Sequence, residues 1–212
     1  MDPNDGGSDL MTEFEVTNEW NGRPITDHET KISMTFSEAK DGVKIELRAP
    51  FFNDPPPPET KPGQPCFKLW DHEVVEVFLL NSKNGNYLEL EFGPHGQHLV
   101  LLLTTNKKCI KHSLPLEYSA EIDLENGTWR GKALVPLSYI PPGVDKFNIY
   151  GIHMDQAKPG DRVYESLFPV PGEQADFHRT QFFGTWNQSH FLFPKITELS
   201  DIWKCALNSP KP

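Results

Sequence analysis

The chain has 212 residues, among them 14 Phe, 5 Trp and 5 Tyr. These aromatic side chains are enough for one sizeable hydrophobic core, which excludes disorder along the whole length of the chain. Its 20 prolines disfavour a helical bundle, because proline interrupts helix interiors and central strands. A net charge of −10 repels phosphate backbones and anionic lipid, so we expect neither a nucleic-acid nor a membrane partner.

The N-terminal segment has the composition of a tail. Residues 1–12 are acidic and Gly-rich and resemble neither a secretory signal nor a transit peptide, so we expect them to be disordered. The three cysteines are widely spaced and form no C-x-x-C pair, which is typical of free thiols in a reducing compartment. We therefore predict a cytoplasmic location.

Alternating apolar residues predict a first β-hairpin. Apolar side chains recur at every second position over 32–36 and again over 43–47, on either side of the turn signal Lys40-Asp41-Gly42. A Pro-rich loop from Pro50 to Pro65 follows. Such a segment is either a ligand for a domain that recognises proline-rich peptides or a stiff surface loop. The stiff loop is favoured because a polyproline II segment stays extended without a bound partner.

The strongest strand pattern follows this loop. It runs over 69–80 and continues over 87–92 and 98–104, with turns at 81–86 and 93–97, which predicts a three-strand meander. The last of these strands is apolar on both faces, so we expect it to be central and covered on both sides.

Shorter patterns complete the chain. Strands are expected at 116–124, 128–137, 147–154, 162–168 and 181–186, and 195–207 is the one helix candidate, with Ser200 as a potential interruption. About ten short strands indicate an all-β fold, an antiparallel β-sandwich of jelly-roll or immunoglobulin-like type. We expect a tail at 1–12, one sandwich domain at 13–190 and a C-terminal extension at 191–212.

The turn at 81–86 predicts which residues face each other across one hairpin. If its two ends pair, the opposed residues are Glu76 and Glu91, Phe78 and Glu89, and Leu80 and Tyr87. The other face of this hairpin is wholly apolar and belongs in the core. Opposed like charges destabilise a sheet, so the acidic face needs a Lys or Arg, a cation such as calcium, or a polyhydroxylated ligand. A solvated face with ordinary salt bridges is an equally good interpretation.

Motifs for other chemistry are absent from the sequence. It contains no G-x-S-x-G, S-x-x-K, P-loop or G-x-G-x-x-G motif. The eight histidines show no H-E-x-x-H or Cys/His cluster spacing, so we expect no zinc or iron site. Apart from calcium as a candidate, we expect no cofactor.

Four segments resemble the family 9 carbohydrate-binding modules. They are WDHEVVEVFL at 70–79, YLELEFGPHG at 87–96, WRGKALVP at 129–136 and DFHRTQFFG at 176–184. The chain is also similar to an animal protein family that has this module together with segments of the PFFNDPPPP and FGPHGQHLVLLL type. The resemblance implies a β-sandwich of the kind shared with DOMON domains. It also implies sugar binding, with Trp70 at an aromatic position.

We therefore predict a non-enzymatic, carbohydrate-binding-like module for a saccharide or another small polar metabolite. The site is expected between the acidic strand pair and the Pro-rich loop, with Trp70 stacking on the ligand. The expected ligand-binding residues are Trp70, Glu76, Tyr87, Glu89, Glu91, His153, His178 and Arg179, the last three at the rim. Two alternatives stay open. One is an enzyme acting on a sugar derivative through paired carboxylates, and the other is a protein-interaction module using residues 50–65.

Overall fold

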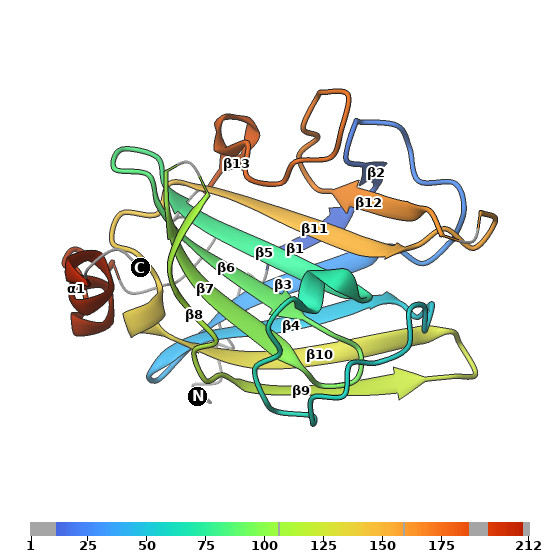
Figure 1. The fold of residues 1–212 in the computed structure, drawn as a ribbon, viewed down its shortest axis with the longest axis horizontal. Helices are drawn as coiled ribbons and strands as arrows, with labels where there is room; N and C mark the ends of the chain where they lie inside the picture. The colour runs from blue at the N-terminus through green and yellow to red at the C-terminus, as the bar shows by residue number, and fades with distance from the viewer. Residues whose placement is uncertain (1–11, 106, 159, 187–194, 210–212) are drawn as a thin grey trace, which may run out of the picture.

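Two antiparallel sheets packed face to face make up the molecule (Figure 1). The structure is a computed structural model that describes residues 12–105, 107–158, 160–186 and 195–209. The predicted all-β sandwich is confirmed. The domain limits at 12 and 190 stay predictions, because residues 1–11 and 187–194 lie outside the described ranges, as do residues 210–212.

The smaller sheet contains the predicted first hairpin. In spatial order its strands are β1 (Glu13–Val16), β3 (Ile32–Ala39), β4 (Gly42–Pro50), β10 (Thr128–Pro136) and β9 (Glu117–Asp123). Phe36 pairs with Ile45 across the hairpin, and both side chains are buried. The alternation seen in the sequence therefore marks the face that packs against the second sheet.

The larger sheet carries the acidic strand pair. In spatial order its strands are β2 (Asn18–Glu19), β12 (Arg162–Ser166), β11 (Lys146–Met154), β5 (Val74–Asn81), β6 (Asn86–Phe92), β7 (His98–Thr104) and β8 (Lys108–His112), and β13 (Gly184–Thr185) pairs with the start of β11. Asn81 pairs with Asn86, so the predicted register of the β5–β6 hairpin is confirmed.

Some predicted strands differ from the observed ones. The strand expected from Leu69 begins at Val74, because Leu69–Asp71 form a 3₁₀ helix, η1, entered through Lys68 at φ 64°. Gln181 lies in a second 3₁₀ helix, η3 (Thr180–Phe182), which leaves only Gly184–Thr185 of the last expected strand. β7 is buried on both faces as predicted, but it lies next to the edge strand β8 rather than at the sheet centre.

The larger sheet has apolar cover on both of its faces. Its inner face packs against the smaller sheet, and the first core includes Val77, Leu90 and Ile149. Its outer face lies beneath segments far away in the sequence and forms a second core, which contains Phe78, Tyr87, Leu101, Tyr150, Phe177 and Phe183. The acidic face predicted from the turn is this covered outer face.

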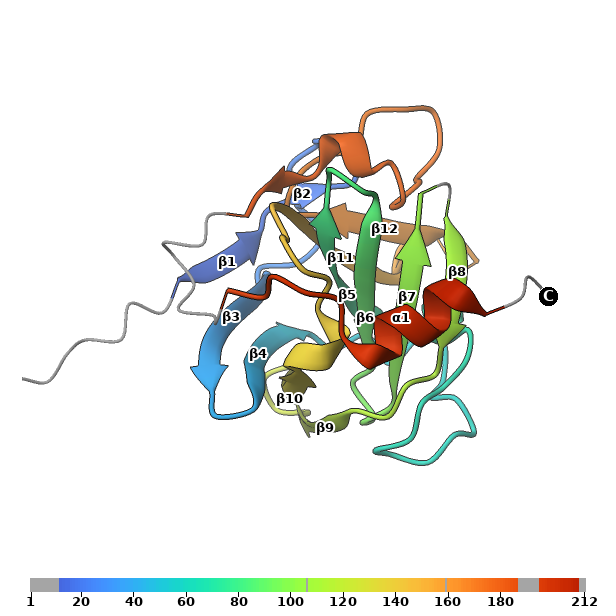
Figure 2. The same cartoon turned by 90° about the vertical axis from the view of Figure 1, so that its left-hand side faces the viewer.

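One short helix lies across an end of the sandwich (Figure 2). It is α1 (Asp201–Asn208), which buries Trp203 against a third 3₁₀ helix, η2 (Leu137–Tyr139). The Ser200 side chain accepts a hydrogen bond from the Trp203 backbone N–H, so this residue begins the helix instead of interrupting it. Within the described residues, no helix has the length and apolar character needed to cross a membrane.

Substitution Ser200→Ala is expected to lower the free energy of unfolding by about 1 kcal/mol, the usual cost of losing an N-cap. The hydroxyl also donates to Ser138 O at 2.6 Å, and this bond is lost as well. Urea denaturation measures the change. Ser209→Ala, at the exposed C-terminal end of the helix, is the control, and equal effects of the two substitutions would contradict the capping role.

Candidate functional site

Three glutamates form a buried cluster on the outer face of the larger sheet. Glu76 lies opposite Glu91 across the β5–β6 pair, and Glu89 lies two residues before Glu91 on the same face. One carboxylate oxygen from each lies within 4.8 Å of the other two. Glu91 is 0% exposed and the other two are also buried. The interpretation as a solvated face is therefore wrong, because the second core covers it.

Burial changes the protonation of this cluster. It raises the pKa of Glu76 to about 8, although the nearby Arg162 cation opposes that shift. Burial, reinforced by the charge of Glu76, raises the pKa of Glu89 and Glu91 well above the ordinary range. Glu89 Oε2 is buried and has no hydrogen-bond partner among the described residues, whereas a hydrogen bond from the Trp70 backbone opposes the rise in the pKa of Glu91. The cluster therefore retains protons at neutral pH and offers buried polar atoms to a ligand.

A cavity of about 350 Å³ lies over this cluster. Its floor includes Glu76, Glu89 and Leu101, from β5, β6 and β7. Its other lining residues are Trp70, Lys107, Cys109, Ile152, Tyr164, Ala175, Asp176, Phe177 and His178. The volume is at the lower end of the range for small-molecule sites, and the mixture of aromatic walls and a few polar groups is typical of them.

Specific contacts hold the cavity walls in place. Arg162 Nη2 donates to Trp70 O at 2.5 Å, which fixes η1 against β12. Asp176 Oδ1 lies 2.5 Å from Lys107 Nζ, which joins the 175–178 segment to the turn after β7. His178 Nδ1 lies 2.9 Å from the Tyr87 hydroxyl. Burial and the charge of Lys107 lower the pKa of His178 to about 4, so this imidazole is neutral at physiological pH.

The structure brings most of the predicted site residues together. Trp70, Glu76, Glu89 and His178 line the cavity. Glu91 belongs to the carboxyl cluster, and Tyr87 supports the wall through His178.

Two predicted residues lie elsewhere. Ile152 lines the cavity, so His153, the next residue on β11, points to the opposite face of the sheet. Arg179 donates through Nη1 to Pro171 O, and its guanidinium lies 4.6 Å from the centre of the Phe182 ring. Neither residue is among those lining the cavity.

The Pro-rich loop does not form a wall of the cavity either. It packs over the 93–97 turn, where Gly63 N donates to Gly96 O and Gln97 Nε2 donates to Thr60 O. The loop therefore covers one end of β6 and β7, and only Trp70, which follows it, reaches the cavity.

Several wall residues were not predicted. Lys107, Tyr164, Asp176 and Phe177 come from three segments that meet only in the folded chain. The DFH segment at 176–178 was the one sequence signal for this wall, and only its His178 was predicted as a site residue.

Animal proteins similar to this chain match over nearly their whole length. The "UPF0462 protein C4orf33 homolog" of Danio rerio is 42% identical over 201 residues, which cover 92% of this chain and 98% of that protein. The homologue of Mus musculus is 45% identical over 199 residues, which cover 90% and 100%. The chain belongs to the UPF0462 family. No family model matches the chain.

Solved structures similar to this UPF0462 chain are β-sandwiches. A candidate carbohydrate-binding protein from Bacteroides uniformis aligns with a TM-score of 0.60 at 14% identity, over 82% of this chain and 85% of that one. A family 9 carbohydrate-binding module from Caldicellulosiruptor kristjanssonii, in complex with cellotriose, has a TM-score of 0.49 at 13% identity, over 95% of this chain and 89% of that one. The likeness to the Bacteroides uniformis protein shows that the two chains share a fold.

Proposed function

We propose that this UPF0462 protein binds a saccharide, or another small polar metabolite, non-covalently in the cavity over β5, β6 and β7. The observation that carries the proposal is the buried Glu89 carboxyl, whose Oε2 has no hydrogen-bond partner among the described residues and which lines, with Glu76, an aromatic-walled cavity of about 350 Å³. Hydroxyl groups of a sugar donate hydrogen bonds and would satisfy this oxygen.

The cavity walls can also contact the apolar face of a sugar ring. Trp70, Tyr164 and Phe177 supply aromatic surface, and Glu76 and Glu89 supply acceptors from the floor. The likeness in fold to the Bacteroides uniformis protein supports the same function. The three free cysteines, Cys66, Cys109 and Cys205, support a cytoplasmic location for it.

A calcium ion is an additional candidate occupant of the carboxyl cluster. Glu76, Glu89 and Glu91 bring carboxylate oxygens, which calcium prefers, to within 4.8 Å of one another. Binding of a divalent cation would require these groups to release their protons, so calcium would compete with protonation. The binding experiment therefore includes measurements with and without calcium.

Titration calorimetry with a panel of mono- and disaccharides tests the proposal. We expect at least one sugar to bind, and Trp70→Ala or Glu89→Leu to weaken its binding about tenfold or more, because the first removes a stacking surface and the second an acceptor. Glu117→Gln, on the exposed edge strand β9, is the matched control and should bind like the wild type. Absence of binding to every sugar, with and without calcium, would refute the proposal.

An enzyme acting on a sugar derivative is the second candidate. The pKa of Glu76 near 8 leaves it protonated at neutral pH, and a carboxyl in this state beside a cavity can donate a proton to a leaving group. Turnover of a chromogenic glycoside that disappears in Glu76→Gln would favour the enzyme over a binding module.

The protein-interaction alternative gains no support from the geometry of the loop. Its groups are used within the chain, since Thr60 O accepts from Gln97 and Pro56 O lies 3.0 Å from His72 Nδ1. A loop held in this way acts as a cover for the sheet end. Recognition of a partner through residues 50–65 stays a prediction.

A further inference from the structure

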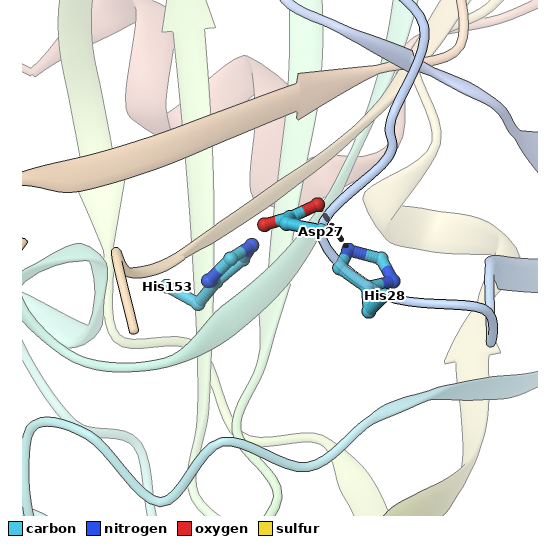
Figure 3. Close-up of side chains that lie close together, drawn as sticks. All are labelled: Asp27, His28 and His153. Carbon is cyan, nitrogen blue, oxygen red and sulfur yellow. Dashed lines mark ion pairs between the residues drawn. The ribbon is translucent and has the colours of Figure 1, made fainter. Parts of the chain in front are cut away.

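A second polar cluster lies on the opposite side of β11 from the cavity. His153 of β11 and Glu165 of β12 meet Asp27 and His28, which lie between β2 and β3. Figure 3 shows the Asp27 carboxylate between the two imidazole rings. His153 is 3% exposed and Glu165 is 0% exposed, so the centre of this cluster is shielded from water.

Three potential ligand atoms converge in the cluster, and a Glu165 oxygen contacts two of these residues. One such atom from each of Asp27, His28 and His153 lies within 4.8 Å of the other two. His28 Nε2 lies 3.6 Å from Asp27 Oδ1 and 2.6 Å from Glu165 Oε1. His153 Nε2 lies 3.6 Å from the same Glu165 oxygen. Donors bound about 2.1 Å from a tetrahedral ion lie about 3.4 Å apart, so two of these separations already approach that geometry.

Backbone carbonyls determine which imidazole nitrogens carry protons. His28 Nδ1 lies 2.6 Å from Thr30 O, and His153 Nδ1 lies 2.8 Å from Met154 O. A carbonyl oxygen only accepts, so each Nδ1 carries a proton and donates it. In the metal-free protein His28 Nε2 also carries a proton, which it donates to Glu165 Oε1, and a bound metal ion would displace that proton. Imidazoles that bind metals are oriented by hydrogen bonds of this kind.

The neighbours of the two deepest residues hold them in place. The His153 ring stacks on Phe52 with centroids 3.7 Å apart and an angle of 6° between the rings. Gly151 lies opposite Glu165 on the paired strands, and a Cβ there would lie 3.1 Å from Glu165 Oε2. The small residue therefore leaves room for the carboxylate.

Two atoms of the cluster are not satisfied by the protein itself. His153 Nε2 and Glu165 Oε2 are buried and form no hydrogen bond with any described residue. Leaving buried polar atoms without partners is costly, and the His28–Glu165 contact satisfies only one carboxylate oxygen. The cluster thus lacks a central electron-pair acceptor, which a metal ion would provide.

We propose that Asp27, His28 and His153, with Glu165 beside the two imidazoles, bind one divalent transition-metal ion, with Zn²⁺ as the first ion to test. Two imidazole nitrogens and a carboxylate oxygen are a donor set that suits zinc. Glu165, in contact with both imidazoles, would orient them towards the ion. The ion would join the 27–28 segment to β11. The proposal is independent of saccharide binding.

No sequence pattern indicated this site, because its ligands are far apart in the chain. Asp27 and His28 are adjacent, but His153 and Glu165 follow more than a hundred residues later. The expectation of no zinc or iron site was based on short-range spacing, which has no bearing on ligands that strand pairing brings together.

Zinc titration of the full-length, tag-free protein after chelator treatment tests the proposal. We expect one Zn²⁺ per chain by native mass spectrometry, a higher Tm on binding, and a Co²⁺ absorption spectrum of tetrahedral type. His153→Gln is expected to weaken Zn²⁺ binding by about 10- to 100-fold or more. His112→Gln removes an exposed histidine and is the control, with unchanged affinity.

A second variant keeps the test decisive if His153→Gln does not fold. Asp27 is half exposed, so Asp27→Asn should fold normally and still weaken Zn²⁺ binding. The proposal is overturned if the wild-type protein binds no zinc at micromolar concentration. It is also overturned if Asp27→Asn and every folded histidine variant of the cluster bind zinc as tightly as the wild type.

Discussion

The free energy of unfolding should fall as the pH rises from about 6 to 8. Burial raises the pKa of Glu76 from 4.5 to about 8, and it raises the pKa of Glu89 and Glu91 as well. The folded state therefore retains protons that the unfolded chain has already released above its ordinary carboxyl pKa. The stabilisation from these retained protons is fully present below the ordinary carboxyl pKa. It is lost as the pH rises towards the folded-state pKa, by about 1.4 kcal/mol of unfolding free energy per pH unit for each retained proton.

Other titrating groups also change the free energy of unfolding over this pH range. Burial raises the pKa of Glu73 to about 7, which adds to the loss of stability with rising pH. His28 has a raised pKa because its contact with Glu165 outweighs burial, so its contribution is also lost as the pH rises. His178 has the opposite sign. Burial lowers its pKa to about 4, so its contribution is lost as the pH falls below about 6.5.

Urea denaturation of the wild type and of Glu91→Gln at pH 6, 7 and 8 checks this expectation. The amide is neutral at every pH, so the variant should be more stable than the wild type at pH 8 by roughly 2 kcal/mol and should show a flatter pH profile. Glu121→Gln, on the exposed strand β9, should behave like the wild type. A wild-type stability that rises between pH 6 and 8 would contradict the assignment.

Substitution His28→Ala should lower the free energy of unfolding by about 3–5 kcal/mol in metal-free protein, because it leaves a buried carboxylate without its partner. Glu165 is fully buried, and its Oε1 lies 2.6 Å from His28 Nε2. Burial alone would raise the pKa of Glu165, yet the imidazoles of His153 and His28 bring it below its ordinary value. The carboxylate is therefore charged in the folded state.

A double-mutant cycle separates this charge effect from loss of packing. Glu165→Gln removes the charge, so His28→Ala should cost much less in that background than in the wild type. His112→Ala removes an exposed imidazole and should change the unfolding free energy little. An equal cost of His28→Ala in both backgrounds would show that the ion pair contributes nothing.

Local sequence patterns were sufficient to predict the β3–β4 and β5–β6 hairpins. The turn between Asn81 and Asn86 determines which residues of β5 and β6 are opposed, and strand alternation then determines the two faces. This is why the carboxyl cluster was predicted from the sequence. Its burial was not, because the covering residues, such as Phe177, come from segments whose position depends on the whole fold.

Tertiary contacts account for the failures. The apolar Leu69 has strand character, but the left-handed backbone of Lys68 directs it into a buried 3₁₀ turn. Strand β8 has lysines at both 108 and 111 and no apolar alternation, so its pattern gave no strand signal. The face of β11 that carries His153 follows from the pairing of Tyr150 with Glu76, which no local pattern shows.

Both sheets end in strands whose exposed side chains are charged. β8 presents Lys108 and Lys111 at one edge, and β9 presents Glu117, Glu121 and Asp123 at another. Unpaired backbone groups at a sheet edge are a template for another chain, and charged side chains oppose such strand addition. The protein is thereby protected against edge-to-edge aggregation at these two strands, even though its large sheet is rich in the apolar, β-branched residues that favour amyloid-like assembly once exposed.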